Sequence, residues 1–160
     1  MEKTKTKVVA ITGSSRGLGR SISEYCNGLG YTTINYCSTD DLRDWSVRQR
    51  IIHSCANVDV FVSVAKPDFT QTELLYEWYS AYADTIRYIA IGSSIVDDAL
   101  WGDNVHMKRY HTQKQSLQHA VNQIASDRVS IINPDHLYDG INYDYQLLDT
   151  WCKDNLGKYL

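Results

Sequence analysis

The segment 7–22 constrains the fold of this 160-residue chain more than any other, because it joins an apolar run to three closely spaced glycines. Residues 8–11 read Val-Val-Ala-Ile, a largely β-branched run that is typical of a strand covered on both faces. Gly13, Gly17 and Gly19 follow at once, and the absence of a Cβ lets the backbone turn sharply and approach a ligand there. A helix that starts after this turn would direct its free N–H groups and its positive dipole end at that ligand. The segment therefore predicts a cradle for a phosphate group.

Short β-branched runs alternate with helix-length segments along the rest of the chain. We predict strands at 7–12, 31–36, 58–64, 87–92 and 129–132, and helices through 21–29, 42–56, 72–85, 105–125 and 143–155. Strand–helix–strand units connect in the right-handed sense, which favours parallel strands covered by helices on both faces. We expect a single dinucleotide-binding domain over 1–160: a doubly wound, Rossmann-like α/β fold of about five strands in three layers, shortened and in the order 2-1-3-4-5.

Composition excludes several other classes of protein. A net charge of −3 without a basic stripe argues against a nucleic-acid partner, and no apolar run is long enough to predict a membrane span or a signal peptide. The four cysteines and five histidines lack metal-ligand spacing, so we expect no metal site. Reduced cysteines within predicted elements indicate a cytoplasmic protein without a membrane association.

Three side chains are predicted to converge at the carboxyl ends of the strands. Ser94 follows the strand at 87–92, where open α/β sheets bind their ligands, and Ser93 remains a rival for the same position. Tyr110 and Lys114 are four residues apart, so they share one face near the start of the helix at 105–125. A crossover helix runs antiparallel to its strands, which brings its first turns to the same edge of the sheet.

The glycine turn from Thr12 to Gly19, followed by Ser94, Tyr110 and Lys114, resembles the short-chain dehydrogenase/reductase family in both motif and order. The resemblance implies that Tyr110 exchanges a proton with the substrate oxygen, that Ser94 polarises the carbonyl group and that Lys114 holds the nicotinamide ribose. The family's Asn-Asn-Ala-Gly segment survives here as Ala65, and its Pro-Gly as Pro134 followed by Asp. By this resemblance the cofactor-binding residues are Thr12, Gly13, Ser15, Arg16, Gly17, Leu18, Gly19, Ser38, Thr39, Ala65, Lys114 and Pro134.

The residues that follow the second predicted strand, at 31–36, indicate which dinucleotide is bound. A fold that binds NAD usually places a carboxylate there to accept hydrogen bonds from the ribose, whereas Ser38 and Thr39 occupy that position here. Arg16 lies in the glycine turn, within plausible reach of a 2′-phosphate. We therefore expect NADP(H) as the cofactor, the alternative being that Arg16 is only a solvated loop residue.

Two departures from the family pattern bear on activity. No asparagine lies between Asn57 and Asn104, so the helix asparagine of the family's proton relay has no counterpart. Only 26 residues follow Pro134, fewer than the family's usual substrate-binding helices and last strand require. The retained Ser, Tyr and Lys favour an oxidoreductase that interconverts a small-molecule carbonyl compound and an alcohol. The missing asparagine and the short segment after Pro134 favour the alternative, a shortened, catalytically weak or inactive dinucleotide-binding or interaction module.

The helix at 72–85 also suggests a homodimer. Tyr76, Trp78, Tyr79 and Tyr82 give it more aromatic surface than one sheet face is expected to cover. Members of the family often pair through this helix and the helix that carries the Tyr-Lys pair, so we expect the same surface to be used here.

Overall fold

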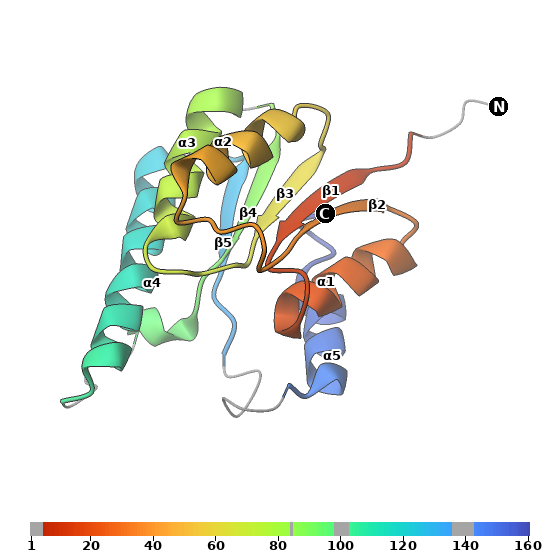
Figure 1. The fold of residues 1–160 in the computed structure, drawn as a ribbon. Helices are drawn as coiled ribbons and strands as arrows, with labels where there is room; N and C mark the ends of the chain where they lie inside the picture. Colours follow the sequence, from red (N-terminus) through yellow and green to blue (C-terminus); the bar gives the residue numbers. More distant parts are fainter. Residues whose placement is uncertain (1–4, 84, 98–102, 136–142) are drawn as a thin grey trace.

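The computed structural model describes residues 5–83, 85–97, 103–135 and 143–160. Helices and strands alternate throughout these ranges, as the hydrophobic pattern predicts (Figure 1). In chain order the elements are β1 (Val8–Thr12), α1 (Gly17–Gly28), β2 (Thr32–Tyr36), α2 (Trp45–Ser54), β3 (Val60–Ser63), α3 (Thr70–Tyr82), β4 (Arg87–Ile91), the 3₁₀ turn η1 (Ser94–Asp97), α4 (Val105–Ile124), β5 (Val129–Ile132) and α5 (Tyr145–Asn155).

The strands form one parallel sheet in the order β2-β1-β3-β4-β5, which confirms the predicted topology. Ala10 of β1 is in register with Ile34 on one side and with Phe61 on the other. The chain therefore leaves β1 towards β2 and returns to β1's other side for β3. Ligands of open α/β sheets bind outside the carboxyl ends of the strands at such a reversal, which here lies beside Thr12 and Ser63.

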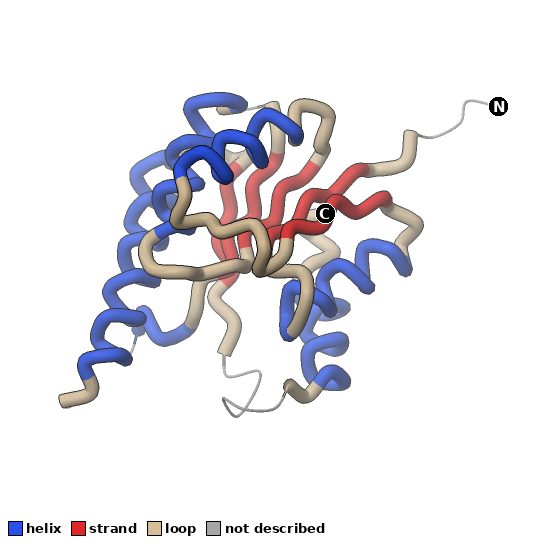
Figure 2. The backbone as a smooth tube through the Cα atoms, in the orientation of Figure 1, coloured by secondary structure: helices blue, strands red, loops and turns tan. Residues whose placement is uncertain are grey.

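Helices cover both faces of the sheet, giving the three expected layers. Figures 1 and 2 show α2, α3 and α4 on one face and α1 with α5 on the other. Each face buries its own apolar cluster, because side chains of a strand alternate between the two sides. The first cluster includes Ala10, Ile51, Phe61, Leu75, Trp78, Tyr88 and Leu117, and the second includes Val9, Ile11, Ile22, Cys26, Val62, Cys152 and Leu156.

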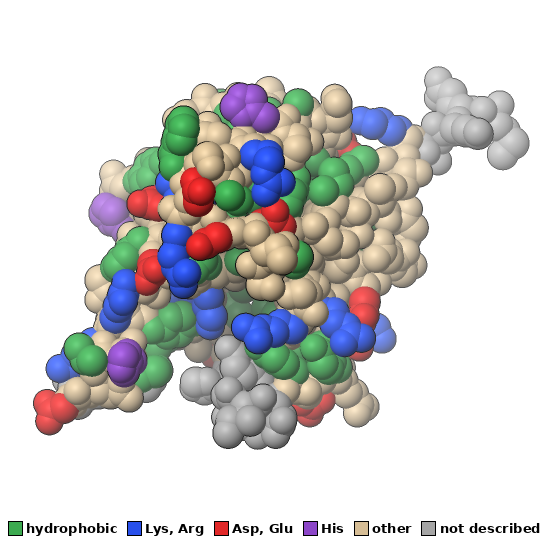
Figure 3. All heavy atoms as spheres, in the orientation of Figure 1, with side chains coloured by type: hydrophobic (Ala, Val, Ile, Leu, Met, Phe, Trp, Pro, Cys, Tyr) green, Lys and Arg blue, Asp and Glu red, His purple; other side chains and the backbone are tan. Residues whose placement is uncertain are grey.

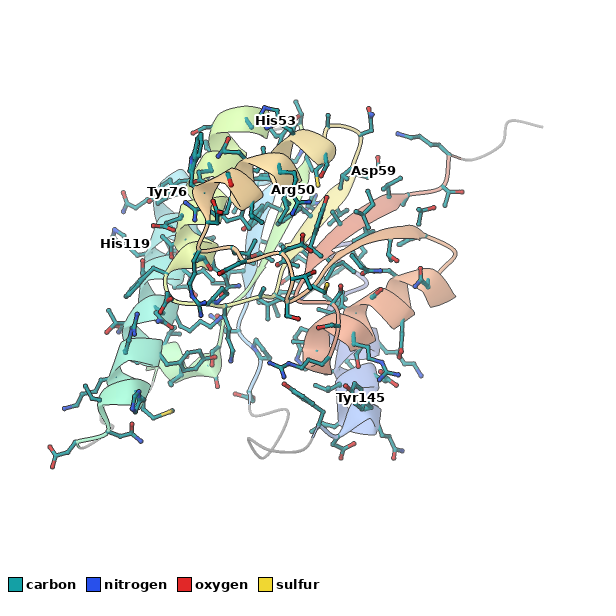
Figure 4. The ribbon with its side chains drawn as sticks, viewed as in Figure 1. Arg50, His53, Asp59, Tyr76, His119 and Tyr145 are labelled. Atoms are coloured by element: carbon teal, nitrogen blue, oxygen red, sulfur yellow. The ribbon has the colours of Figure 1, made fainter. Side chains whose placement is uncertain are left out.

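The aromatic residues of α3 do not form the exposed surface that the sequence suggested. The indole ring of Trp78 is only 1% exposed and lies 4.1 Å from the ring centroid of Phe61 and 4.8 Å from that of Tyr82. Tyr82 and Tyr79 pack against the same cluster, and Tyr76, labelled in Figure 4, stays 45% exposed. The sheet face covers more of the aromatic surface than expected. The homodimer therefore stays a prediction, and exposed aromatic side chains on α3 no longer support it.

Three local features differ from expectation. The helix expected at 72–85 is α3, which begins two residues earlier and ends before Ala83, where the backbone φ of 41° leaves the helical region. The helix expected at 42–56 begins only at Trp45, because the side chain of Asp44 accepts the N–H of Ser46 and caps the first turn. The 3₁₀ turn η1 was not predicted.

The buried aromatic cluster predicts a large difference between two variants of one helix. Trp78→Ala should lower the free energy of unfolding by about 3–5 kcal/mol, because it leaves a cavity between Phe61 and Tyr88. Tyr76→Ala removes an exposed ring from the same helix and should change that free energy by less than about 0.5 kcal/mol. Urea unfolding measures both, and similar losses in the two variants would contradict the packing described here.

Candidate functional site

The glycine turn joins β1 to α1 as predicted. Gly13 has a φ of 71°, and its N–H donates to the carbonyl oxygen of Tyr36 at the end of β2 at 2.8 Å. A Cβ on Gly19 would overlap the carbonyl oxygen of Gly13, so the first turn of α1 packs directly on the end of β1. No acidic side chain occupies the first turn of α1. The arrangement suits an anion at the start of the helix.

The turn is also fastened to the loop that follows β3. Thr12 Oγ1 accepts the backbone N–H groups of Val64 at 3.1 Å and of Ala65 at 3.3 Å. A Cβ on Gly13 would lie 2.9 Å from the backbone nitrogen of Ala65, so position 13 has no room for a side chain. The predicted cofactor residues Thr12, Gly13 and Ala65 are therefore brought together where the strand order reverses.

Tyr110 and Lys114 share one face of α4, and a second lysine joins them. Lys66 Nζ lies 3.3 Å from Tyr110 Oη and 4.5 Å from the centre of its ring. Lys114 Nζ lies 5.7 Å from the same ring centre. Lys66 was not predicted as a site residue. The only signal for it in the sequence is that a basic residue follows Ala65, where the family motif has glycine.

Lys114 is buried and points into the sheet edge. Its side chain is 2% exposed, and Nζ donates to Gln71 Oε1 at 2.7 Å and to the carbonyl oxygen of Ile91 at 3.0 Å. Burial, and secondarily the Lys66 ammonium, lower the pKa of Lys114 to about 7. These contacts engage the ammonium with the protein itself, and the expected role of Lys114 in holding the nicotinamide ribose stays a prediction.

Gln71 is a second residue that sequence reasoning missed. Its amide nitrogen donates to the carbonyl oxygens of Ser63 at 2.9 Å and Ile91 at 3.1 Å, so it joins the ends of β3 and β4 while its oxygen accepts from Lys114. A signal was present, because Gln71 precedes Leu74 by three residues and lies on the buried stripe of α3. A polar residue on such a stripe requires internal partners.

The two serines at the end of β4 have different surroundings. Ser93 Oγ accepts the N–H of Ile95 at 3.3 Å, so its hydroxyl is engaged in the turn η1. Ser94 opens η1, and its N–H donates to the carbonyl oxygen of Pro134 at 3.0 Å. The structure thus places Ser94 and Pro134 side by side. The Ser93 hydroxyl accepts in this contact and keeps its own proton to donate, so Ser93 and Ser94 both stay candidates for the residue that meets a ligand.

The residues expected at the adenosine end lie on the surface. Ser15, Arg16, Ser38 and Thr39 are all exposed. The first carboxylate after β2, Asp40, is held back in its turn. It accepts the N–H of Cys37 at 3.0 Å and pairs with Arg50 at 2.7 Å. Figure 3 shows Lys and Arg side chains gathered on this face between α1 and α4. Because the charge of Asp40 is paired with Arg50, this carboxylate repels an anionic ligand at the start of α1 less than a free carboxylate would.

Two tyrosines from the C-terminal part of the chain reach the glycine turn, and no sequence pattern linked them to it. The N–H of Gly17 donates to Tyr145 Oη at 3.1 Å. A Cβ on Gly17 would lie 2.6 Å from the ring of Tyr143, so that ring rests on the glycine. The predicted residue Gly17 is therefore in place, but its N–H already has a partner.

Within the described part of the chain, no group of three or more His, Cys, Asp and Glu side chains is arranged to hold a metal ion. In the same ranges, no helix combines the length and the apolar character that crossing a bilayer requires.

Lys114 predicts a pH-dependent contribution to stability. Its pKa of about 7 in the folded chain lies below the ordinary 10.5, so between these values the folded state binds fewer protons than the unfolded state. The free energy of unfolding should therefore rise as the pH increases from 7 towards 10.5, by at most about 1.4 kcal/mol per pH unit from this group. Below pH 7 the cost of burying the ammonium is fully present.

Lys114→Met removes the titrating group and should flatten this part of the profile, measured by urea unfolding between about pH 6 and pH 9. Lys108→Met changes an exposed lysine of the same helix and should leave the profile of the parent intact. Parallel profiles for the parent and Lys114→Met would contradict the lowered pKa.

No protein-family model matches the sequence, and no curated protein matches it either. Solved structures do share its fold. The 3-alpha-hydroxysteroid dehydrogenase from Pseudomonas sp. B-0831, complexed with NADH, matches with a TM-score of 0.66 and 15% identity, over 96% of this chain and 91% of that chain. A short-chain dehydrogenase from Streptomyces avermitilis matches with a TM-score of 0.70 and 16% identity, over 90% and 70%.

A GDP-L-fucose synthetase from Naegleria fowleri matches with a TM-score of 0.68 and 13% identity, over 86% of this chain and 52% of that chain. At identities this low, the similarity establishes the fold alone. The chain has the Rossmann-like parallel sheet of the short-chain dehydrogenase/reductases, as the motif resemblance predicted.

Proposed function

We propose that the chain is an NADP(H)-dependent oxidoreductase of the short-chain dehydrogenase/reductase type, which interconverts a small-molecule carbonyl compound and its alcohol. One observation carries this proposal: Tyr110, with Lys66 and Lys114 beside its ring, lies at the carboxyl edge of the sheet that also presents the glycine turn. The fold neighbour from Pseudomonas sp. B-0831, a complex with NADH, supports a nicotinamide dinucleotide as the cofactor.

The dinucleotide would supply or accept the hydride, and the chain's own residues would handle the substrate oxygen. Tyr110 would provide the proton that the developing alkoxide needs. Ser94 would donate a hydrogen bond to the same oxygen. Lys66 Nζ lies within hydrogen-bond distance of Tyr110 Oη and would stabilise negative charge on the phenol oxygen during proton transfer. Lys114, engaged with Gln71 and β4, would position the helix that carries Tyr110.

The surroundings of β2 support NADP(H) over NAD(H). Asp40 is paired with Arg50, so its charge opposes a 2′-phosphate less than a free carboxylate would. Arg16 is the extended residue at the N-cap position of α1, and its side chain is exposed, as are the hydroxyl residues Ser38 and Thr39 that follow β2. A guanidinium in this position suits a phosphate that only NADP(H) carries.

Arg16→Ala tests this cofactor choice. The variant should lose roughly ten- to a hundredfold in NADPH affinity and little in NADH affinity, because a charge-assisted contact is worth about 1.5–3 kcal/mol. Calorimetric titration with each dinucleotide measures this difference. Arg128→Ala, an exposed arginine at the opposite edge of the sheet, is the matched control and should retain both affinities. Equal losses for NADPH and NADH in Arg16→Ala would mean that Arg16 only shapes the turn.

Tyr110→Phe tests the chemistry. It should lower NADPH-dependent reduction of an activated carbonyl compound by at least about a hundredfold with little change in cofactor affinity, because only the proton donor is removed. Lys66→Met should lower kcat in the same direction, whereas the exposed Lys108→Met should not. A Tyr110→Phe variant as fast as the parent would overturn the assigned role.

A catalytically inactive dinucleotide-binding or interaction module is the second candidate. It is favoured by the inward position of Lys114 and by the hydrogen bond that already occupies the N–H of Gly17. Tight NADPH binding without turnover in a broad carbonyl and alcohol screen would select this candidate over the oxidoreductase.

A further inference from the structure

We propose that Tyr145 is an affinity-determining residue of the dinucleotide site, because its hydroxyl competes with the cofactor's diphosphate for the N–H of Gly17. The inference rests on the proposed function for the identity of the ligand. Its structural basis is a contact between residues 128 positions apart in the chain, 3.1 Å from Gly17 N to Tyr145 Oη.

Tyr145 is the first residue of α5, and α5 packs against α1. Ile22 and Cys26 of α1 share an apolar cluster with Cys152 and Leu156 of the C-terminal part. This contact holds the two helices together and brings the start of α5 to the start of α1, where Figure 4 labels Tyr145. The position of Tyr145 is thus fixed by the packing of the second core.

Two further contacts keep the tyrosine on the glycine turn. The guanidinium of Arg20 lies over the ring of Tyr145, with Cζ 4.9 Å from the ring centre, and Arg20 is itself paired with Glu24 at 2.9 Å. Tyr143 covers a second side of Gly17, with its ring 2.6 Å from the place a Cβ would take. The hydroxyl of Tyr145 therefore occupies the N–H of Gly17, and the ring of Tyr143 covers its Cα.

A diphosphate at the start of α1 requires free N–H groups from the first helical turn. In the described structure the N–H of Gly17 donates to a neutral phenol oxygen instead. The negatively charged ligand makes the stronger hydrogen bond, so it can displace the hydroxyl, but its affinity is reduced by the contact that it replaces. Tyr145 would lower the affinity for NADPH and NADH equally, because both carry the diphosphate.

Tyr145→Phe is the sharpest test, since it removes the hydroxyl but keeps a ring beneath Arg20. It should raise the affinity for NADPH and for NADH by the same factor, about two- to tenfold, measured by calorimetric titration. Tyr145→Ala also removes the ring and should raise both affinities at least as much. Tyr25→Phe alters a half-buried tyrosine of α1 that packs against the same apolar cluster, and it should change neither affinity.

Unchanged or weakened binding of both dinucleotides by Tyr145→Phe would overturn the proposal, weakened binding showing instead that the hydroxyl is a cofactor ligand. If neither the parent chain nor the Tyr145 variants bind NADPH or NADH, the proposed function fails. The competition at Gly17 is then tested with inorganic pyrophosphate as the ligand. Tighter pyrophosphate binding by Tyr145→Phe than by the parent would support the competition at Gly17, whereas equal binding, or none, would overturn it.

Discussion

The close packing of the glycine turn is the constraint on which the rest of the site depends. The carbonyl oxygen of Gly13 occupies the space that a Cβ on Gly19 would need, and Ala65 lies against Gly13 from the loop after β3. These contacts leave no room for larger side chains between the end of β1, the start of α1 and the neighbouring strand. They fix the position of the first N–H groups of α1. They also hold the loop after β3 in place, and from this loop Lys66 reaches Tyr110 of α4.

Two lysines lie near Tyr110 at the sheet edge, and they differ in burial. Lys114 is nearly inaccessible to water, and its neighbours Gln71 and Ile91 offer uncharged oxygens, so burial dominates and lowers its pKa. Lys66 is exposed, keeps solvent around its ammonium and reaches the Tyr110 hydroxyl. A mechanism that needs a cation beside the phenol therefore has a better candidate in Lys66 than in the lysine of the Tyr-x-x-x-Lys motif.

Much of the fold could be predicted from the sequence, because short β-branched runs and the glycine turn carry strong local signals. The strand order followed from right-handed crossovers, and the structure confirms it. Gln71 could have been found from its place on the apolar stripe of α3. The contacts of Lys66 with Tyr110 and of Tyr145 with Gly17 could not, because they depend on how distant segments pack rather than on spacing along the chain. The buried Trp78 shows the same limit, since aromatic composition does not reveal how much of a helix one sheet face covers.

The proposed function requires that the glycine turn bind the diphosphate of a nicotinamide dinucleotide. A crystal structure of the parent chain grown with NADPH tests it most directly. We expect the diphosphate to lie against the first N–H groups of α1, the hydroxyl of Tyr145 to have moved away from Gly17, and the 2′-phosphate to lie beside Arg16. A structure with NADPH bound elsewhere, and with Tyr145 still hydrogen-bonded to Gly17, would contradict it.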